Sequence, residues 1–161
     1  MSVRRNAPIE RHAHVLGTRG LPLDMRSHGP AAYHARMNSR FFGAWLLDSF
    51  EQELSNGTVA RPWGDDPVGI ISWDVSGYFA VQLGPRTPIP GASYISFFGT
   101  ANAPEGDSGT IILTVSGSAA PERVNGDQVR QFLFMEPGLL RMQPPAAADG
   151  TQSTYMWRRQ G

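Results

Sequence analysis

The chain of 161 residues contains no cysteine and no lysine. Without cysteine it cannot hold a disulfide framework, a thiolate nucleophile, a cysteine-ligated zinc ion or an iron–sulfur cluster. Without lysine it cannot form a Schiff base with a carbonyl substrate, and it cannot build the phosphate-binding loop that ends in a lysine. All 14 basic residues are therefore arginine. These two absences exclude several classes of enzyme before any pattern in the sequence is considered.

Histidine is confined to the N-terminal part of the chain. The four histidines are His12, His14, His28 and His34, and none follows in residues 39–161. A Ser-His-Asp triad or a histidine-rich metal site is therefore excluded from that long segment. No Gly-x-Gly-x-x-Gly unit opens a helix, so a dinucleotide site is not indicated. We expect a protein that works without a metal ion and without a cofactor.

Long apolar runs and an excess of charge are also missing. No run approaches the roughly 18 apolar residues of a membrane-spanning helix, and no run of about 7–15 has the form of a secretory signal. We therefore expect a cytoplasmic protein without a transmembrane segment. The chain has 14 Arg and 14 Asp plus Glu, for a formal net charge of zero. This balance argues against nucleic acid as a partner, and the oligomeric state stays open.

The charge is divided unevenly along the chain. Residues 1–38 carry six arginines and two acids, whereas residues 39–161 carry eight arginines and twelve acids. Residues 1–38 also contain glycine, proline and serine and show no sustained apolar period. We expect them to form a basic, disordered and flexible N-terminal extension, with an organelle transit peptide as the alternative. Residues 39–161 are expected to fold as one domain.

From residue 41 onward, short apolar runs alternate with turn residues. The runs predict strands at 43–54, 58–62, 68–74, 78–83, 94–101, 110–116, 128–135, 139–143 and 153–159. Eight or nine short strands without a core helix indicate an all-β fold. Hairpin-length connections favour an antiparallel up-and-down barrel over a sandwich, because a closed barrel has no exposed sheet edge.

Several of the predicted strands have one face that mixes aromatic side chains with a polar group. A barrel interior lined in this way would hold a small ligand, and a solid core is the alternative. The side chains that we expect to contact the ligand are Trp63, Tyr78, Gln82, Tyr94, Phe98 and Arg130. Tyrosine and glutamine can hydrogen-bond a carbonyl or hydroxyl group, and arginine can hold an enolate or a carboxylate. Alternatively, Arg130 pairs with Asp127 or Glu136 at the surface.

Several separated motifs occur in the order that a known family shows. They are Gly43-Ala44-Trp45, Pro62–Gly69, Gly77-Tyr78-Phe79, Tyr94–Thr100, Gly117-Ser118, Gln128-Val129-Arg130 and Trp157-Arg158-Arg159. Over residues 41–159 the chain resembles the small lipocalin-like domain proteins of bacteria and fungi. The resemblance implies a calycin-type barrel with an interior site for a small apolar molecule. It also implies that Arg159 packs over Trp45, beside Gly43, and closes the barrel base in a structural role.

Two functions are compatible with such a barrel. The first is binding of a small hydrophobic molecule, of polyketide or terpenoid type, in the interior. The alternative is a cofactor-free cyclase, isomerase or dehydratase that acts on such a molecule in secondary-metabolite biosynthesis. Members of the family often carry a histidine on the strand before the Gly-Ser pair, but here that strand is Ile111–Val115. No catalytic residue is therefore predicted, and whether the protein is an enzyme stays open.

Overall fold

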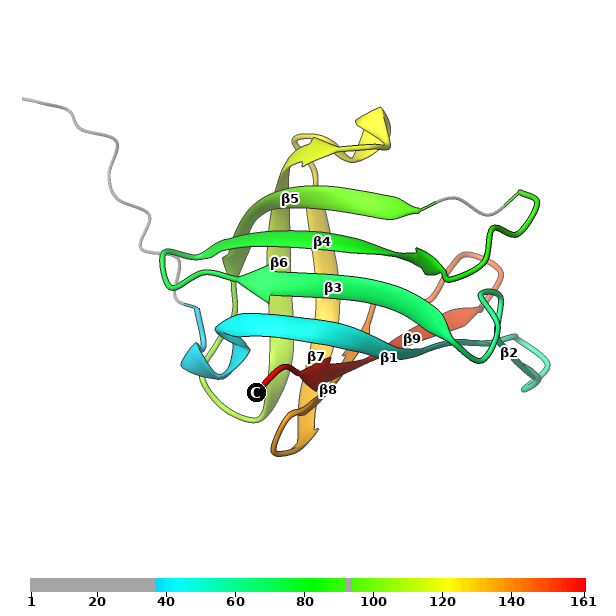
Figure 1. Cartoon of the computed structure of the whole chain (residues 1–161), viewed down its shortest axis with the longest axis horizontal. Helices are drawn as coiled ribbons and strands as arrows, with labels where there is room; N and C mark the ends of the chain where they lie inside the picture. The colour runs from blue at the N-terminus through cyan, green and yellow to red at the C-terminus, as the bar shows by residue number, and fades with distance from the viewer. Residues whose placement is uncertain (1–36, 92–93) are drawn as a thin grey trace, which may run out of the picture. The chain divides into compact units, whose positions relative to one another are not determined.

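The strands form one antiparallel sheet that closes on itself. The computed structural model describes residues 37–91 and 94–161. The strands within them are β1 (Gly43–Glu53), β2 (Val59–Ala60), β3 (Pro67–Trp73), β4 (Tyr78–Pro85), β5 (Ile95–Asn102), β6 (Ser108–Ser118), β7 (Asp127–Glu136), β8 (Leu139–Gln143) and β9 (Gln152–Arg159). From β3 to β9 each strand pairs with the next, and β1 pairs with both β3 and β9 (Figure 1). The predicted all-β up-and-down barrel is confirmed.

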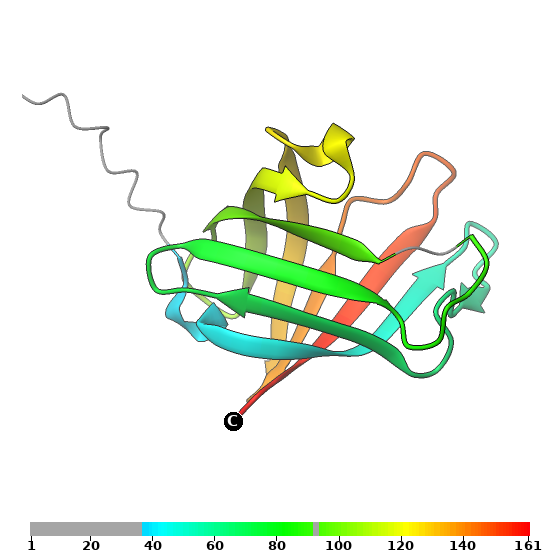
Figure 2. The same cartoon turned by 45° about the horizontal axis from the view of Figure 1, so that its top comes forward.

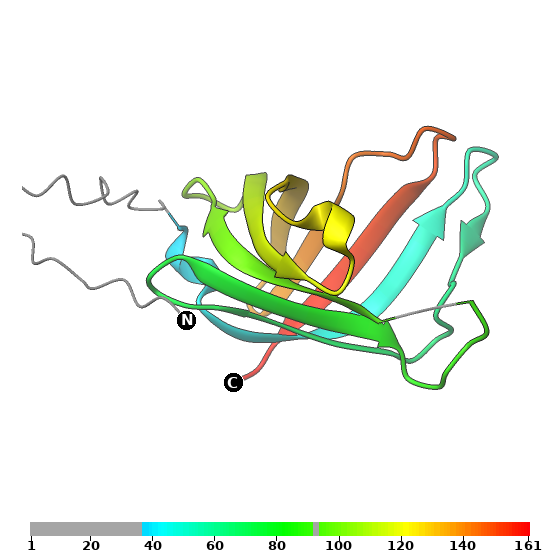
Figure 3. The same ribbon diagram turned by 90° about the horizontal axis from the view of Figure 1, so that it is seen from above.

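The ring closes between β1 and β9, which lie side by side in Figure 3. Strand β2 lies outside the ring and pairs only with the far end of β1. The described residues contain no α-helix, and their two 3-10 helices are η1 (Ser39–Phe41) and η2 (Pro121–Arg123). Helix η2 belongs to the connection between β6 and β7, which is yellow in Figure 2.

Alternation along the strands separates the core from the outer surface. On β4, Phe79, Val81 and Leu83 are buried, and the residues between them are exposed. On β6, Ile111 and Leu113 are buried in the same way. Because successive side chains of a strand point to opposite faces, each strand contributes every second residue to the barrel interior.

Residues 37–42 fill one end of the barrel, which we call the base. Phe41 is completely buried, and its ring centroid lies 5.0 Å from those of Trp73 and Phe132 and 4.9 Å from that of Phe134. The indole N–H of Trp45 donates a hydrogen bond to the carbonyl oxygen of Phe41 over 2.7 Å. Edge-on aromatic packing of this kind fills the base with side chains.

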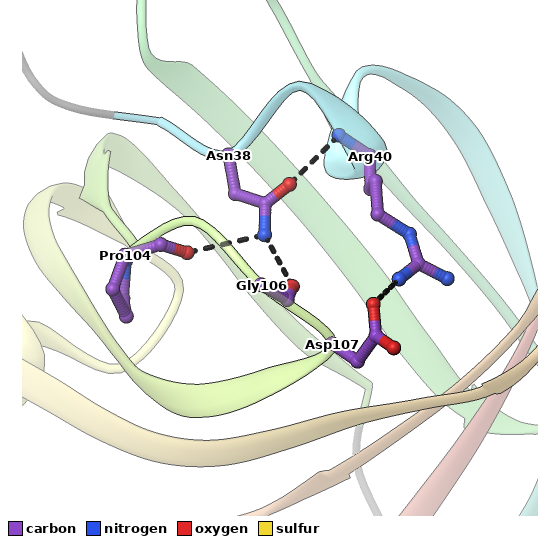
Figure 4. Close-up of polar contacts among 5 residues, drawn as sticks. All are labelled: Asn38, Arg40, Pro104, Gly106 and Asp107. Carbon is purple, nitrogen blue, oxygen red and sulfur yellow. Dashed lines mark hydrogen bonds and ion pairs between the residues drawn. The ribbon is translucent and has the colours of Figure 1, made fainter.

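Asn38 ties this N-terminal segment to the loop between β5 and β6 (Figure 4). Its Nδ2 donates to the carbonyl oxygens of Pro104, over 3.1 Å, and of Gly106, over 2.8 Å. Its Oδ1 accepts a hydrogen bond from the backbone N–H of Arg40 over 3.0 Å. The guanidinium of Arg40 in turn pairs with Asp107. The fully buried Asn38 therefore satisfies two carbonyl groups that no strand partner reaches.

The barrel domain starts earlier than the expected boundary at residue 39. Met37 is 8% exposed and Asn38 is fully buried, so both belong to the core. The expected extension of residues 1–38 lies outside the described residues except for these two, and its predicted disorder stays a prediction.

Candidate functional site

A cavity of about 90 Å³ lies inside the barrel, above the filled base. Apolar side chains of β3 to β6, β8 and β9 form most of its wall. They include Val81, Leu83, Ile95, Phe97, Leu113 and Trp157. Each of these occupies an inward position of its strand, so the wall follows directly from the alternation of the strands.

Three polar side chains complete the lining: Arg123, Arg130 and Tyr155. Arg123 is the last residue of η2, and its guanidinium carbon lies 6.0 Å from the centroid of the Phe97 ring. Arg130 comes from the middle of β7 and Tyr155 from β9. Two positive groups and one phenol therefore reach an otherwise apolar interior from three different elements.

Arg130 is the predicted ligand-binding residue that the structure places in the cavity wall. Its Nη1 donates to the carbonyl oxygen of Val129 over 2.7 Å, and its Nη2 donates to Oε1 of Gln128 over 3.3 Å. It pairs with neither Asp127 nor Glu136. Burial lowers the pKa of Arg130, because the apolar surroundings disfavour the charged form. The nearby Tyr155 raises that pKa, and the positive charge of Arg123 lowers it.

Tyr155 stacks against Phe50, with 4.7 Å between the ring centroids. Burial raises the pKa of its phenol, while the positive charges of Arg130 and Arg123 act in the opposite direction. The phenol is thus neutral near pH 7 and available as a hydrogen-bond donor. Sequence reasoning missed Tyr155, although its spacing from Trp157 in the last strand places both side chains on one face.

Trp63 packs behind the cavity wall. Its ring centroid lies 4.2 Å from that of Phe50 and 6.4 Å from that of Tyr155. The tryptophan is half-buried, packs against the core and is not among the residues that line the cavity.

The other four predicted ligand-binding residues lie on the outer surface. Tyr78, Tyr94 and Phe98 are 59%, 54% and 55% exposed, and Gln82 is also exposed. The structure therefore does not bring them into the interior cavity. The physical reason is the direction of the sheet curvature, which turns the purely apolar face of β4 inward and the mixed face outward.

Two of these outward aromatic rings cover glycines. A Cβ added to Gly117 would lie 2.5 Å from the Phe98 ring, and one added to Gly84 would lie 2.9 Å from the Tyr94 ring. Each ring therefore lies directly against a glycine of a neighbouring segment, in space that a side chain would otherwise take. This packing explains aromatic residues on the outer face without any ligand.

Gly43, Trp45 and Arg159 meet at the base. The guanidinium carbon of Arg159 lies 5.6 Å from the Trp45 ring centroid, within the range of a cation–π contact. Its Nη2 donates to the carbonyl oxygen of Phe42 over 2.6 Å. Gly43 has a φ of 108°, which favours glycine, and a Cβ there would lie 3.8 Å from the same Nη2. These contacts lie outside the cavity lining.

Two further features of the described residues bear on function. Within residues 37–91 and 94–161, no three His, Asp or Glu side chains come together in a way that could hold a metal ion. The same residues form no helix with the length and hydropathy needed to cross a membrane.

A closed antiparallel barrel with an apolar interior cavity and a tryptophan–arginine pair at its base is the architecture of the lipocalin-like proteins. A family model described as a lipocalin-like domain matches residues 42–159, and the chain belongs to that family. Among solved structures, the chain is similar to a redesigned β-barrel, with a TM-score of 0.46 and 16% identity over 78% of this chain and 99% of that one. No curated protein matches the chain. Membership in the family fits ligand binding in general.

Proposed function

We propose that the protein binds a small, largely apolar molecule inside its barrel. The observation that supports this function is the interior cavity, whose wall is apolar except for Arg123, Arg130 and Tyr155. A mostly apolar cavity with a few polar groups is the usual form of a small-molecule site. The volume of about 90 Å³ suits a molecule of one small ring or a short chain.

The volume also bears on the polyketide or terpenoid expected from the sequence. Binding sites for larger molecules usually enclose about 300–1,000 Å³, well above the 90 Å³ of this cavity. A ligand of that size would have to displace side chains at the cavity. Arg123 is the lining residue best suited to move, because it lies on a short connection between strands.

A cavity-filling substitution tests the proposal. Benzene fits a small apolar cavity, and its binding can be followed by two-dimensional NMR of the amides near Val81 and Leu113. We expect saturable shifts at these amides, and an affinity lowered at least about tenfold by Ile95→Trp, because the larger ring occupies the space that benzene would take. Ile70→Trp is the matched control, because Ile70 lies on the outer face of β3.

Ile70→Trp should leave the affinity for benzene unchanged. The proposal would be contradicted if wild-type protein showed no saturable shifts at the cavity. Equal weakening of binding by both tryptophan variants would contradict it as well, because the site would then lie elsewhere.

A cofactor-free isomerase, cyclase or dehydratase is the second candidate, and Tyr155 favours it. In such a dehydratase the Tyr155 phenol would donate its proton to the departing hydroxyl group, which leaves as water, and the resulting phenolate would take up the α-proton of the substrate. Arg130 would stabilise the negative charge that develops on the neighbouring carbonyl oxygen. A β-hydroxy ketone is incubated with the purified protein; NMR spectroscopy would reveal an isomer, and mass spectrometry would reveal a dehydrated product by its loss of water. If the compound binds in the cavity and is recovered unchanged, binding alone remains. A role in secondary-metabolite biosynthesis stays a prediction.

A further inference from the structure

This inference rests on the proposed ligand binding and concerns the charge of the ligand. The cavity receives two guanidinium groups, from Arg123 and Arg130, yet its remaining wall is apolar apart from the Tyr155 phenol. Taking a cation out of water is unfavourable unless an anion or hydrogen bonds compensate for it. Among residues 37–91 and 94–161, no carboxylate lines the cavity beside these two groups.

The ion pairs of the protein involve other arginines than the two at the cavity. In the part of the chain that the structure describes, every ion-paired arginine is at the surface. These pairs are Arg40 with Asp107, Arg61 with Glu51 and Asp65, Arg86 with Asp66, and Arg158 with Asp48. Among the same residues, neither Arg123 nor Arg130 has a carboxylate partner. Arg130, which burial takes out of water, is thus among the described arginines without a carboxylate partner.

The hydrogen bonds of Arg130 leave room for a ligand. A guanidinium has five N–H donors in a planar fork that matches a carboxylate. Within the described residues, Arg130 uses its donors on two neutral acceptors, the carbonyl oxygen of Val129 and the side chain of Gln128. Neither acceptor neutralises the positive charge. Further donors remain for an oxyanion.

The charges at the cavity also favour an anionic ligand. Burial lowers the pKa of Arg130, and the charge of Arg123 lowers it further, so the two guanidinium groups repel each other. Tyr155 does not compensate, because burial raises the pKa of its phenol and keeps it neutral. An anion between these groups would remove the repulsion.

We propose that the ligand is a small monocarboxylate whose carboxylate group is bound by Arg130, Arg123 and the Tyr155 hydroxyl. Its apolar body lies against the wall formed by Phe97, Leu113 and Trp157. The arginines then recognise the charged end of the ligand, and the apolar wall recognises its hydrocarbon part.

Hexanoate and hexanamide form a matched pair of probes, because they have nearly the same shape and differ in charge. Titrations of wild-type protein at pH 7, followed by two-dimensional NMR, should give hexanoate an affinity at least about tenfold higher than that of hexanamide, as expected for hydrogen bonds to a charged group. Arg130→Gln should abolish this preference, chiefly by lowering the affinity for hexanoate. Arg141→Gln, a neighbouring outward position on β8 with the same change in charge, should keep it.

The outcomes separate the two proposals. Equal affinities of wild-type protein for the two probes at the cavity would overturn the anion inference and leave the proposed binding function intact. Shifts confined to the outer surface, unchanged in Arg130→Gln, would also overturn it. If neither probe nor benzene binds in the cavity, the proposed function itself fails.

A second variant guards against loss of folding. If Arg130→Gln does not fold, Arg123→Gln replaces it, since Arg123 lies on η2 outside the sheet. We expect it to reduce the preference for hexanoate about threefold, because one of two charges remains. A preference for hexanoate in Arg123→Gln as strong as in wild-type protein would refute the inference.

Discussion

At Gly99 the structure has no space for any side chain. A Cβ at this position would lie 1.9 Å from the carbonyl oxygen of Thr114 on the neighbouring strand. The register between β5 and β6 also shifts between Phe98 and Gly99. Glycine is therefore required here by the close approach of two backbones, which permits the bend of the sheet.

Gly99→Ala should lower the free energy of unfolding by about 2–3 kcal/mol, because the added methyl group forces the two strands apart. Gly126→Ala is the control, since its Cβ would meet the nearest atom at 3.4 Å. Urea unfolding followed by tryptophan fluorescence measures both. Similar stability of the two variants would show that β5 and β6 adjust without cost.

The sequence predicts which residues share one face of a strand. It does not predict which of the two faces points into the barrel. The segment 94–100 carries aromatic residues on both faces, so the pattern alone does not say whether Phe97 or Phe98 lies inside. That choice depends on the curvature of the whole sheet. Arg130 was predicted as a ligand contact and lines the cavity, whereas the exposed Tyr78 was assigned to the interior because its strand face mixes polar and aromatic residues.

At the scale of elements, the turn residues locate most strands. The predicted segment 139–143 coincides with β8, and the predicted 43–54 differs from β1 by one residue. The sequence does not predict η1 and η2, because a 3-10 helix of three residues is too short to show a period. The role of Met37 and Asn38 was missed for a related reason: their burial depends on contacts with the distant β5–β6 loop.

The segment that fills the base yields a prediction about where the barrel domain begins. Two truncated proteins, one starting at Met37 and one starting at Ser39, differ only in the buried pair Met37 and Asn38. The shorter protein should be less stable by about 3–5 kcal/mol, because it loses a buried apolar side chain and leaves two carbonyl groups without partners. Thermal and urea unfolding of the two proteins measure the difference.

The truncation starting at Met37 is the matched control, since it keeps every contact described for the base. Equal stability of the two truncated proteins would mean that Asn38 does not hold the loop between β5 and β6 in solution. A second comparison, Asn38→Ala in the full chain, separates the lost hydrogen bonds from the lost Met37 side chain.

At the scale of the whole molecule, the sequence predicts closure of the sheet but not the size of the interior. Closure follows from the number of strands and from the disadvantage of exposed edges. The cavity volume depends on how side chains such as Phe97 and Trp157 pack, and that packing follows from the register of all strands together. A pattern along one strand contains no such information, and the sequence therefore left a hollow and a solid interior open.

Because the sheet is closed, β1 and β9 should be protected from hydrogen exchange, whereas in an open sheet they would be edge strands. In the ring, β1 and β9 are hydrogen-bonded to neighbours on both sides, like β5 and β6 in the middle of the sheet order. The hydrogen-bonded amides of β1, β5, β6 and β9 should therefore exchange only when the whole barrel unfolds. Their exchange rates should rise together as urea is added below the unfolding transition.

Strand β2 provides the internal control, because it has two residues and pairs only with β1. Its amides should exchange at least about a hundredfold faster than those of β9 and should respond little to urea, as local opening requires no exposure of the core. Fast, urea-independent exchange in β9 would instead show that the ring opens between β1 and β9. Ligands would then have a route into the cavity through that seam, because Tyr155 and Trp157 of β9 line it.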